Sequence, residues 1–281
     1  MSRFLKFLIF LLFIFAVLFY CKRTVQDKNE EKLEVPKTLQ AIPEQIISRD
    51  AYVVSYNNET KCPNWVAWHL TGDNTQGIYK RTGVPFLDEN GHAYGIAHFS
   101  SELSHNHYIV DLEVNGPRQQ HDDWAENGLE MTHGHLCPAA DNKWSKEAQN
   151  QCSLLSNICP QTERLNTGSW NKLEGKCREW ANNYGDIYSV AGPVFYNHQI
   201  TRTFGKNQVA IPDAFFKVVL CVNDNPKAIG FIYANDNESH SLKNAICTVD
   251  HVEQVTGIDF FPLLPDEVEN QIENSSNINE W

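Results

Sequence analysis

The sequence predicts an α+β fold with a mainly antiparallel central sheet and flanking helices. Its 281 residues are 42% hydrophobic and 21% charged, a composition that allows a sizeable core and excludes a disordered chain. Segments with strand character outnumber segments with helical character, and the two kinds do not alternate strictly, as they would in a parallel β/α fold. We therefore expect one globular domain built around an antiparallel sheet.

Seven segments are rich in β-branched and aromatic residues and are separated by turn residues. The first two form a hairpin-like start to the sheet. The predicted strands are residues 51–57, 64–70, 108–114, 153–158, 186–195, 214–222 and 228–235.

Two segments have apolar side chains at the three- and four-residue spacing that is typical of an amphipathic helix. The clearer one is residues 169–182, where two tryptophans, a leucine and a cysteine recur. The second spans residues 241–256 and contains valines three residues apart. Both are predicted to flank the sheet.

The N-terminus has the pattern of an export signal. Residues 7–21 form an apolar run with Arg3 and Lys6 before it and two basic residues after it. The run is short for a membrane-spanning helix, so residues 1–21 are predicted to be a signal peptide or a signal anchor. Cys21 also resembles the lipid-accepting cysteine of bacterial lipoproteins, whereas a buried N-terminal helix is the alternative. We expect an exported protein, secreted or anchored to a membrane on its extracytoplasmic side.

The rest of the chain divides into three parts. Residues 22–48 are charged, contain prolines and read as a tether. The folded domain is predicted over residues 49–265. Residues 266–281 form an acidic tail without Lys or Arg, which we expect to fray.

Cysteine chemistry follows from the predicted export, since exported cysteines can oxidise. Apart from Cys21, the chain has seven cysteines, an odd number, so at least one thiol is free or pairs with another chain. The pairing pattern itself stays open.

Polar residues with catalytic potential are densest between residues 132 and 174. His135 follows a glycine at a place where a turn leaving a strand would expose its imidazole. An imidazole titrates near neutral pH and suits a general base that activates water. A lone histidine is more often structural, so this residue alone does not establish catalysis.

Asn166 and Glu174 lie just before and within the clearer predicted helix, and both side chains could face one site. Their oxygen atoms suit a hard cation such as Mg²⁺, which keeps several waters and takes few protein ligands. The alternative is that Asn166 caps the helix and Glu174 is a solvated surface charge.

Several short motifs follow one another in a characteristic order along the chain. Residues 132–139 read Thr-His-Gly-His-Leu-Cys-Pro-Ala. They are followed by LSNICPQ at 155–161, by Leu-Asn-x-Gly-x-Trp and Leu-Glu within 165–174, by AGPVF at 191–195 and by IPDAFFK at 211–217. Over about residues 51–265 this order resembles the DNA/RNA non-specific endonuclease family of ββα-metal nucleases, which includes secreted bacterial nucleases and mitochondrial endonuclease G.

The resemblance implies a metal-dependent, sequence-non-specific endonuclease that hydrolyses DNA and RNA. His135 would be the general base that deprotonates the attacking water. Asn166 would bind a single Mg²⁺, with Mn²⁺ as a possible substitute, and Glu174 would hold metal-bound water. The ββα-metal motif would then lie on the predicted antiparallel domain.

The resemblance also assigns supporting roles. Asn157 would order the loop that carries the catalytic histidine. The family uses an arginine ahead of the histidine motif to stabilise the transition state; Arg81 is the best match, with Arg118 second.

The chain departs from the family where Asp-Arg should precede Gly-His, because Thr132 and His133 stand there. Loss of an oriented donor at developing charge costs about 2.7 to 4 kcal/mol of transition-state stabilisation. The departure motivates a second hypothesis, a surface protein that keeps the nuclease fold with weakened catalysis. A third, minor hypothesis is a zinc hydrolase that uses His133, His135 and Cys137 as ligands.

The net charge of −12 opposes an anionic partner at first sight. Residues 131–206, which carry the main motifs, contain eight basic and six acidic side chains and sum to +2. The chain as a whole is acidic while the motif region is mildly basic. We therefore expect weak, salt-sensitive and metal-assisted contact with nucleic acid at a local patch.

Overall fold

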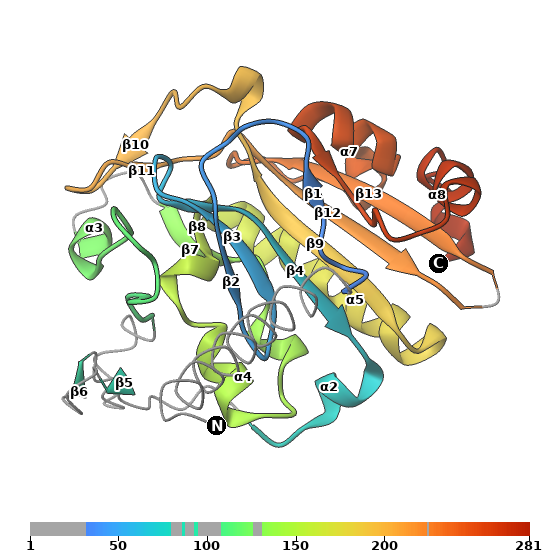
Figure 1. Ribbon diagram of the computed structural model, residues 1–281, viewed down its shortest axis with the longest axis horizontal. Coiled ribbons are helices and arrows are strands. Elements are labelled where there is room, and N and C mark those ends of the chain that lie inside the picture. Colours follow the sequence, from blue (N-terminus) through green and yellow to red (C-terminus); the bar gives the residue numbers. More distant parts are fainter. Residues whose placement is uncertain (1–31, 80–85, 88–92, 95–107, 126–130, 224) are drawn as a thin grey trace, which may run out of the picture.

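A computed structural model describes residues 32–79, 86–87, 93–94, 108–125, 131–223 and 225–281 (Figure 1). The apolar run at residues 7–21, the predicted signal, lies outside these ranges. Among the described helices, none has the length and apolar character needed to cross a membrane.

The centre of the molecule is a seven-stranded sheet in the order β14-β13-β12-β9-β4-β3-β2, and every neighbouring pair is antiparallel. This confirms the predicted α+β class with a mainly antiparallel sheet. Short two-stranded pairs surround it: β1 with β15, β5 with β6, β7 with β8, and β10 with β11. The strands are β1 (Lys37–Thr38), β2 (Gln45–Ser48), β3 (Val53–Asn57), β4 (Cys62–Leu70), β5 (Phe86–Leu87), β6 (Ala93–Tyr94), β7 (Met131–His135), β8 (Ile158–Thr162), β9 (Ile187–Val194), β10 (Thr203–Phe204), β11 (Val209–Ala210), β12 (Ala214–Cys221), β13 (Lys227–Ala234), β14 (Ile246–Cys247) and β15 (Ile258–Asp259).

The helices are short except for one. The α-helices are α2 (Gly72–Gln76), α3 (His121–Ala125), α4 (Lys146–Gln151), α5 (Asn171–Tyr184), α6 (Leu242–Ala245), α7 (Val249–Thr256) and α8 (Asp266–Glu273). The 3-10 turns are η1 (Ala139–Asp141), η2 (Leu155–Asn157), η4 (Tyr196–His198) and η5 (Ile278–Glu280), and η3 (Leu165–Trp170) is a π-helix that runs into α5.

The sheet is buried on both faces, so its central strands β9 and β12 are almost entirely apolar; the exceptions include the buried Ser189 and Lys217. Successive side chains of β12, such as Phe215 and Phe216, belong to two different core clusters because neighbouring residues of a strand point to opposite faces. One cluster includes Leu173 and Trp180 of α5, and the other includes Val252 of α7. In Figure 1, α5 and the pair α7 and α8 accordingly lie against different parts of the sheet.

The structure differs from three local predictions. Residues 108–114 make only a single β-bridge, Ile109 to Leu154, because Asp111 accepts a hydrogen bond from the Glu113 N–H and so favours a turn. Residues 153–158 form the buried turn η2, since a short apolar run does not distinguish a strand from a buried helical turn. The helix predicted over 241–256 is interrupted by β14, and Thr248 caps a new helix, α7.

Both predicted flanking segments extend the fold. The sheet begins at Gln45, within the predicted tether, because β2 pairs with β3. The acidic tail does not fray: α8 buries Ile272, and the Trp281 ring packs 4.8 Å from that of Trp180. Apolar residues spaced through the acidic sequence anchor this end.

Candidate active site

A strand–strand–helix unit positions the candidate site. β7 pairs antiparallel with β8, so that His135 lies opposite Ile158, and η3 and α5 follow β8 almost directly. The helix is tied back to β7 by Asn166, whose Nδ2 donates to Thr132 Oγ1 at 2.9 Å and to the His133 carbonyl at 3.3 Å. These contacts bring the π-helix against the strand that ends in His135.

The three residues predicted for the centre of the site line a single pocket. Its volume is about 350 Å³, and His135, Asn166 and Glu174 all contribute to its wall. Each comes from a different part of the unit: the end of β7, η3, and the first turns of α5. The remaining wall is formed by Tyr108, His133, Pro138, Ala139, Ala140, Thr167, Asn171 and Arg178.

His135 is held by its backbone and its surroundings. It is the last residue of β7 and is only 8% exposed. The Trp170 indole N–H donates to the His135 carbonyl at 3.1 Å, and the imidazole centroid lies 5.4 Å from the Tyr108 ring. The ring therefore meets solvent mainly through the pocket, which is the placement that a general base needs.

The pocket has oxygen atoms suited to a hard cation. Both hydrogen bonds of Asn166 use its amide nitrogen, and none of the described donors bonds to its amide oxygen. Glu174 adds a carboxylate to the same pocket. Amide and carboxylate oxygens are the ligands that Mg²⁺ prefers, so these residues fit a divalent cation of that kind.

Asn157 lies behind the pocket and is fully buried. Its Oδ1 accepts from the Cys137 N–H at 2.9 Å, and its Nδ2 donates to the carbonyls of Cys137 and Cys152, each at 2.9 Å. The side chain thus fixes the loop that leaves His135 to the end of α4. Sequence resemblance assigned it to this loop, and the structure shows the three bonds through which it can act.

The two residues that depart from the family motif have well-defined environments. The Thr132 hydroxyl donates to the Gln161 carbonyl at 3.0 Å while it accepts from Asn166. The His133 ring is sandwiched between Tyr108, at 3.8 Å between centroids, and Trp124, at 3.7 Å. An aromatic stack therefore occupies the place where the family motif has arginine.

Arg178 supplies a cation that the sequence analysis did not assign to the site. It lines the pocket, and its Nη1 donates to Asp141 Oδ1 at 2.9 Å. Asp141 is 1% exposed and also accepts from the Trp68 indole at 3.1 Å. The available signal was the four-residue spacing from Glu174, which places both side chains on one face of a helix.

The charge of this buried network is balanced over several groups. Burial raises the pKa of Asp141, and the nearby cations Arg178 and Lys217 oppose that rise. The Lys217 ammonium lies 4.9 Å from the Trp68 ring centroid and 4.7 Å from that of Trp170. Cation–π contact of this kind stabilises an ammonium that has no hydrogen-bond partner among the described residues.

Two arginine predictions have different outcomes. Arg81 lies outside the described residues. Arg118, the second choice, donates through Nη1 to the Val114 carbonyl at 2.7 Å and is not part of the pocket wall.

The predicted zinc trio is wrong. Cys137 lies beyond the end of β7, is fully buried and interacts with the thiol of Cys152, while His133 is held in its aromatic stack. Within the described ranges, the one group of His, Cys, Asp and Glu side chains with ligand atoms within 4.8 Å of one another is Asp250, Glu253 and Glu273, far along the chain from the histidine motif.

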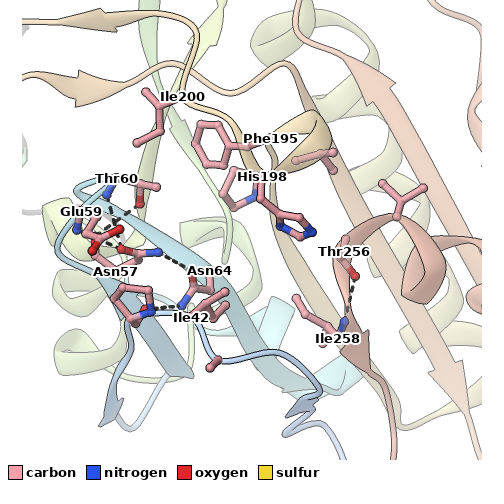
Figure 2. A pocket seen from close by; sticks show the side chains of 15 residues that line it. Ile42, Asn57, Glu59, Thr60, Asn64, Phe195, His198, Ile200, Thr256 and Ile258 are labelled. Atoms are coloured by element: carbon pink, nitrogen blue, oxygen red, sulfur yellow. Dashed lines mark hydrogen bonds between the residues drawn. The ribbon is translucent and has the colours of Figure 1, made fainter.

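A second pocket, of about 290 Å³, lies beside the end of β9 (Figure 2). Asn57 donates to Asn64 Oδ1 at 3.0 Å and accepts from the Glu59 N–H at 2.9 Å, while Asn64 donates to the Pro43 carbonyl at 3.0 Å. Its amides therefore serve the local structure. The His135 pocket, which combines an imidazole, a carboxylate and a guanidinium, is the better candidate for catalysis.

Comparison with known proteins agrees with this arrangement. A solved EndoG structure, determined as the EndoG/EndoGI complex, aligns with a TM-score of 0.63 at 21% identity and covers 80% of this chain and 88% of that one. This likeness shows that the two proteins share a fold. Residues 29–267 match the DNA/RNA non-specific endonuclease model, and the chain belongs to that family.

Named relatives are nucleases from several sources. Mitochondrial nuclease EXOG of Danio rerio is 31% identical over 228 residues, which cover 76% of this chain and 60% of that protein. Mitochondrial endonuclease G of Bos taurus is 27% identical, with 78% and 69% covered. Nuclease C1 of Cunninghamella echinulata var. echinulata is 29% identical, with 78% and 83% covered. The chain thus spans less than two thirds of the zebrafish protein. Family membership confirms the resemblance that the motifs predicted.

Proposed function

We propose that the protein is an exported endonuclease that hydrolyses phosphodiester bonds of DNA and RNA without sequence preference and depends on a Mg²⁺-type cation. The observation that carries the proposal is the convergence of His135, Asn166 and Glu174 on one pocket in a member of this family. A base, a cation site and a phosphate-sized space are the parts that metal-assisted phosphodiester hydrolysis requires.

In this mechanism the neutral imidazole of His135 removes a proton from the attacking water. Its backbone is fixed by β7 and by the Trp170 indole, and the Tyr108 ring lies beside its imidazole, which limits the freedom of the ring before substrate arrives. Proton transfer by a positioned side chain contributes about 10² to 10⁴ in rate.

Asn166 and Glu174 would hold the divalent cation, the first through its amide oxygen and the second through its carboxylate or a water between them. When bound, this cation supplies positive charge against the phosphate and the leaving oxygen. Arg178, kept at the pocket by Asp141, would bind a non-bridging phosphate oxygen. Contacts to phosphate carry no base information, which agrees with the absence of sequence preference in this proposal.

Cleavage assays test the activity. We expect the purified protein to cut plasmid DNA and RNA with Mg²⁺ and to stop with chelator. His135→Ala should lower the initial rate by at least about 10²-fold. His251→Ala, an exposed position on α7, is the matched control and should cleave like the wild type. Cleavage that persists in chelator, or is unchanged in His135→Ala, would reject the mechanism.

The export proposal rests on residues 1–21 and is tested separately. Fractionation of the producing cells should place the full chain in the extracellular or membrane fraction, accessible to added protease. A variant without residues 1–21 should stay inside the cell. Retention of the full chain in the cytoplasm would reject export and leave the proposed catalysis untouched.

A further inference from the structure

Four buried cysteines of the described chain lie in two spatial pairs. Cys137 and Cys152 form one pair, because Asn142 Nδ2 contacts both of their sulfurs. Cys62 and Cys159 form the other: Gln119 Nε2 donates to the carbonyls of Lys61 and Ile158, the residues that precede them, each at 2.8 Å. All four are present as thiols. One pair of neighbouring cysteines could arise by chance in a core. Two pairs in a chain that is proposed to be exported call for a chemical explanation.

The backbone around the first pair is already drawn together. Asn142 Nδ2 lies 3.2 Å from the Cys137 sulfur and 3.4 Å from the Cys152 sulfur, which confines both sulfurs to one small space. The Asn157 amide nitrogen bonds to the carbonyls of the same two cysteines, each at 2.9 Å. A disulfide needs its two Cα atoms within about 7 Å, and the two partners that Cys137 and Cys152 share favour such an approach.

We propose that Cys137 bonds to Cys152, and Cys62 to Cys159, as disulfides in the mature protein, while Cys177, Cys221 and Cys247 remain thiols. The pairing follows from the contacts above; the place of oxidation rests on the proposed export, and the positioning role described below rests on the proposed catalysis.

The chemistry is thiol–disulfide exchange with a disulfide oxidant, either a small molecule such as oxidised glutathione or an oxidoreductase. One cysteine thiolate attacks the oxidant's S–S bond and forms a mixed disulfide. The second cysteine thiolate then displaces the remaining oxidant sulfur. Formation of each protein S–S bond transfers two electrons and two thiol protons to the oxidant, which leaves as two thiols.

Burial determines when the bonds form. Burial raises the pKa of the Cys137 and Cys159 thiols well above the ordinary value, so little attacking thiolate exists in the folded protein. We therefore assign oxidation to the folding chain. Once formed, the bonds are shielded from reductant by the same burial.

The first bond has a consequence for catalysis. Cys137 follows His135 by one intervening residue, and Cys152 caps the end of α4. The covalent link therefore joins the loop that leaves the general base to a helix of the surrounding shell. It acts in parallel with Asn157 and makes Cys137 and Cys152 positioning residues.

Peptide mapping tests the pairing. The full chain is refolded in a glutathione redox buffer and then denatured in the presence of an alkylating agent. It is digested without reduction and analysed by mass spectrometry. We expect linked peptides for Cys137–Cys152 and Cys62–Cys159, and alkylated Cys177, Cys221 and Cys247. Different pairs, or alkylation of all seven cysteines, would overturn the proposal. The mapping does not depend on nuclease activity, and it distinguishes export as well: correct pairs after refolding but only thiols in protein isolated from cells would reject export alone.

Variants test the positioning role. In the oxidised state, Cys137→Ala/Cys152→Ala should lower kcat several-fold with little change in KM and should lower Tm by about 5 °C. Under strong reductant applied during folding, wild type and variant should converge in kcat. Cys177→Ala, which replaces another buried thiol, is the control and should show the same kcat difference from wild type under both conditions. A kcat ratio between the double variant and wild type that is equal in the oxidised and reduced states would remove the positioning role.

Discussion

Arg178 is oriented by a carboxylate that has almost no contact with solvent. Asp141 accepts hydrogen bonds from both Arg178 and Trp68, at 2.9 and 3.1 Å, so the guanidinium cannot turn away from the pocket without leaving a buried acceptor poorly paired. The arrangement pre-organises positive charge beside the candidate base, and such charge stabilises a transition state without reorganisation during the reaction.

We expect Arg178→Met to lower kcat/KM by about 10²-fold, because the pocket loses a fixed cation. Asp141→Asn should give a smaller loss, since the guanidinium is retained and only its orientation is weakened. Steady-state cleavage of a defined oligonucleotide measures both effects. Arg164→Met removes the same charge from an exposed residue outside the pocket wall and serves as control; equal losses in Arg164→Met and Arg178→Met would show a general effect of net charge.

His133 tests whether the departure from the family motif has weakened the site. Its ring is stacked between Tyr108 and Trp124, and Arg178 already places a guanidinium at the pocket. We therefore expect His133→Arg to raise kcat/KM by less than about tenfold, below the 10² to 10³ typical of one oriented donor. A gain of 10²-fold or more over a slow wild type would instead support the nuclease-fold surface protein with decayed catalysis.

The residues of the site were predictable to different degrees. His135, Asn166 and Glu174 stand at recognisable places in ordered motifs, and their convergence follows once the strand–strand–helix unit forms. Tyr108 and Trp124 stack on His133 from segments ahead of β7, a contact that depends on tertiary packing and has no local periodicity. The role of Asp141 was equally unpredictable, because nothing in the sequence near it indicates that the residue is buried.

At the scale of elements, the long strands were predictable because β4, β9, β12 and β13 are eight or nine residues long and predominantly apolar. The short elements were not predictable from the sequence. The run at residues 153–158 is decided by the Asn157 side chain, whose three bonds to neighbouring backbone compete with strand pairing. Asn166 lies in a π-helix, a rare element that no spacing rule in the sequence indicates and that recurs at functional sites.

The loop between β7 and η1 gives the prediction at this scale. Asn157→Ala removes all three bonds and leaves the Cys137 N–H buried without its partner, so the free energy of unfolding should fall by about 2 to 3 kcal/mol. Asn157→Asp keeps the acceptor for the Cys137 N–H but loses the donor to the two carbonyls, and should also be destabilised. Urea unfolding measures both variants. Asn244→Ala, an exposed asparagine on α6, should leave stability unchanged; a wild-type midpoint for Asn157→Ala would show that the loop is held by other contacts.

At the scale of the whole molecule, part of the acidic charge lies C-terminal to the motif region, on helices α7 and α8. Helices α7 and α8 carry Asp250, Glu253 and Glu273, whose carboxylate oxygens lie within 4.8 Å of one another. Glu273 is 4% exposed, and its Oε1 has no hydrogen-bond partner among the described residues. Burial, together with the neighbouring carboxylates, raises the pKa of Glu273 from 4.5 to about 9 and that of Glu253 to about 7.

This cluster predicts how stability depends on pH. Between pH 4.5 and about 9 the folded state holds a proton on Glu273 that the unfolded chain has released, so the free energy of unfolding must fall as pH rises through that interval. Glu273→Gln mimics the protonated carboxyl and removes the dependence due to this residue. At pH 8.5 in chelator we expect its Tm to exceed that of the wild type by at least about 3 °C, equivalent to ~1 kcal/mol in a domain of this size, and to match it near pH 4.5.

Glu267→Gln is the matched control, because Glu267 is exposed on the same helix and should change Tm little at either pH. Repeating the measurement without chelator separates two causes, proton binding and charge neutralisation by a divalent cation. A bound cation would also reduce the repulsion among the three carboxylates. It would raise the wild-type Tm but not that of Glu273→Gln. A constant Tm difference between Glu273→Gln and wild type across the pH range would mean that Glu273 is already ionised in the folded protein. The acidic helices would then be stabilised by their apolar contacts alone, with Ile272 and Trp281 holding the C-terminal end against the repulsion of its own charges.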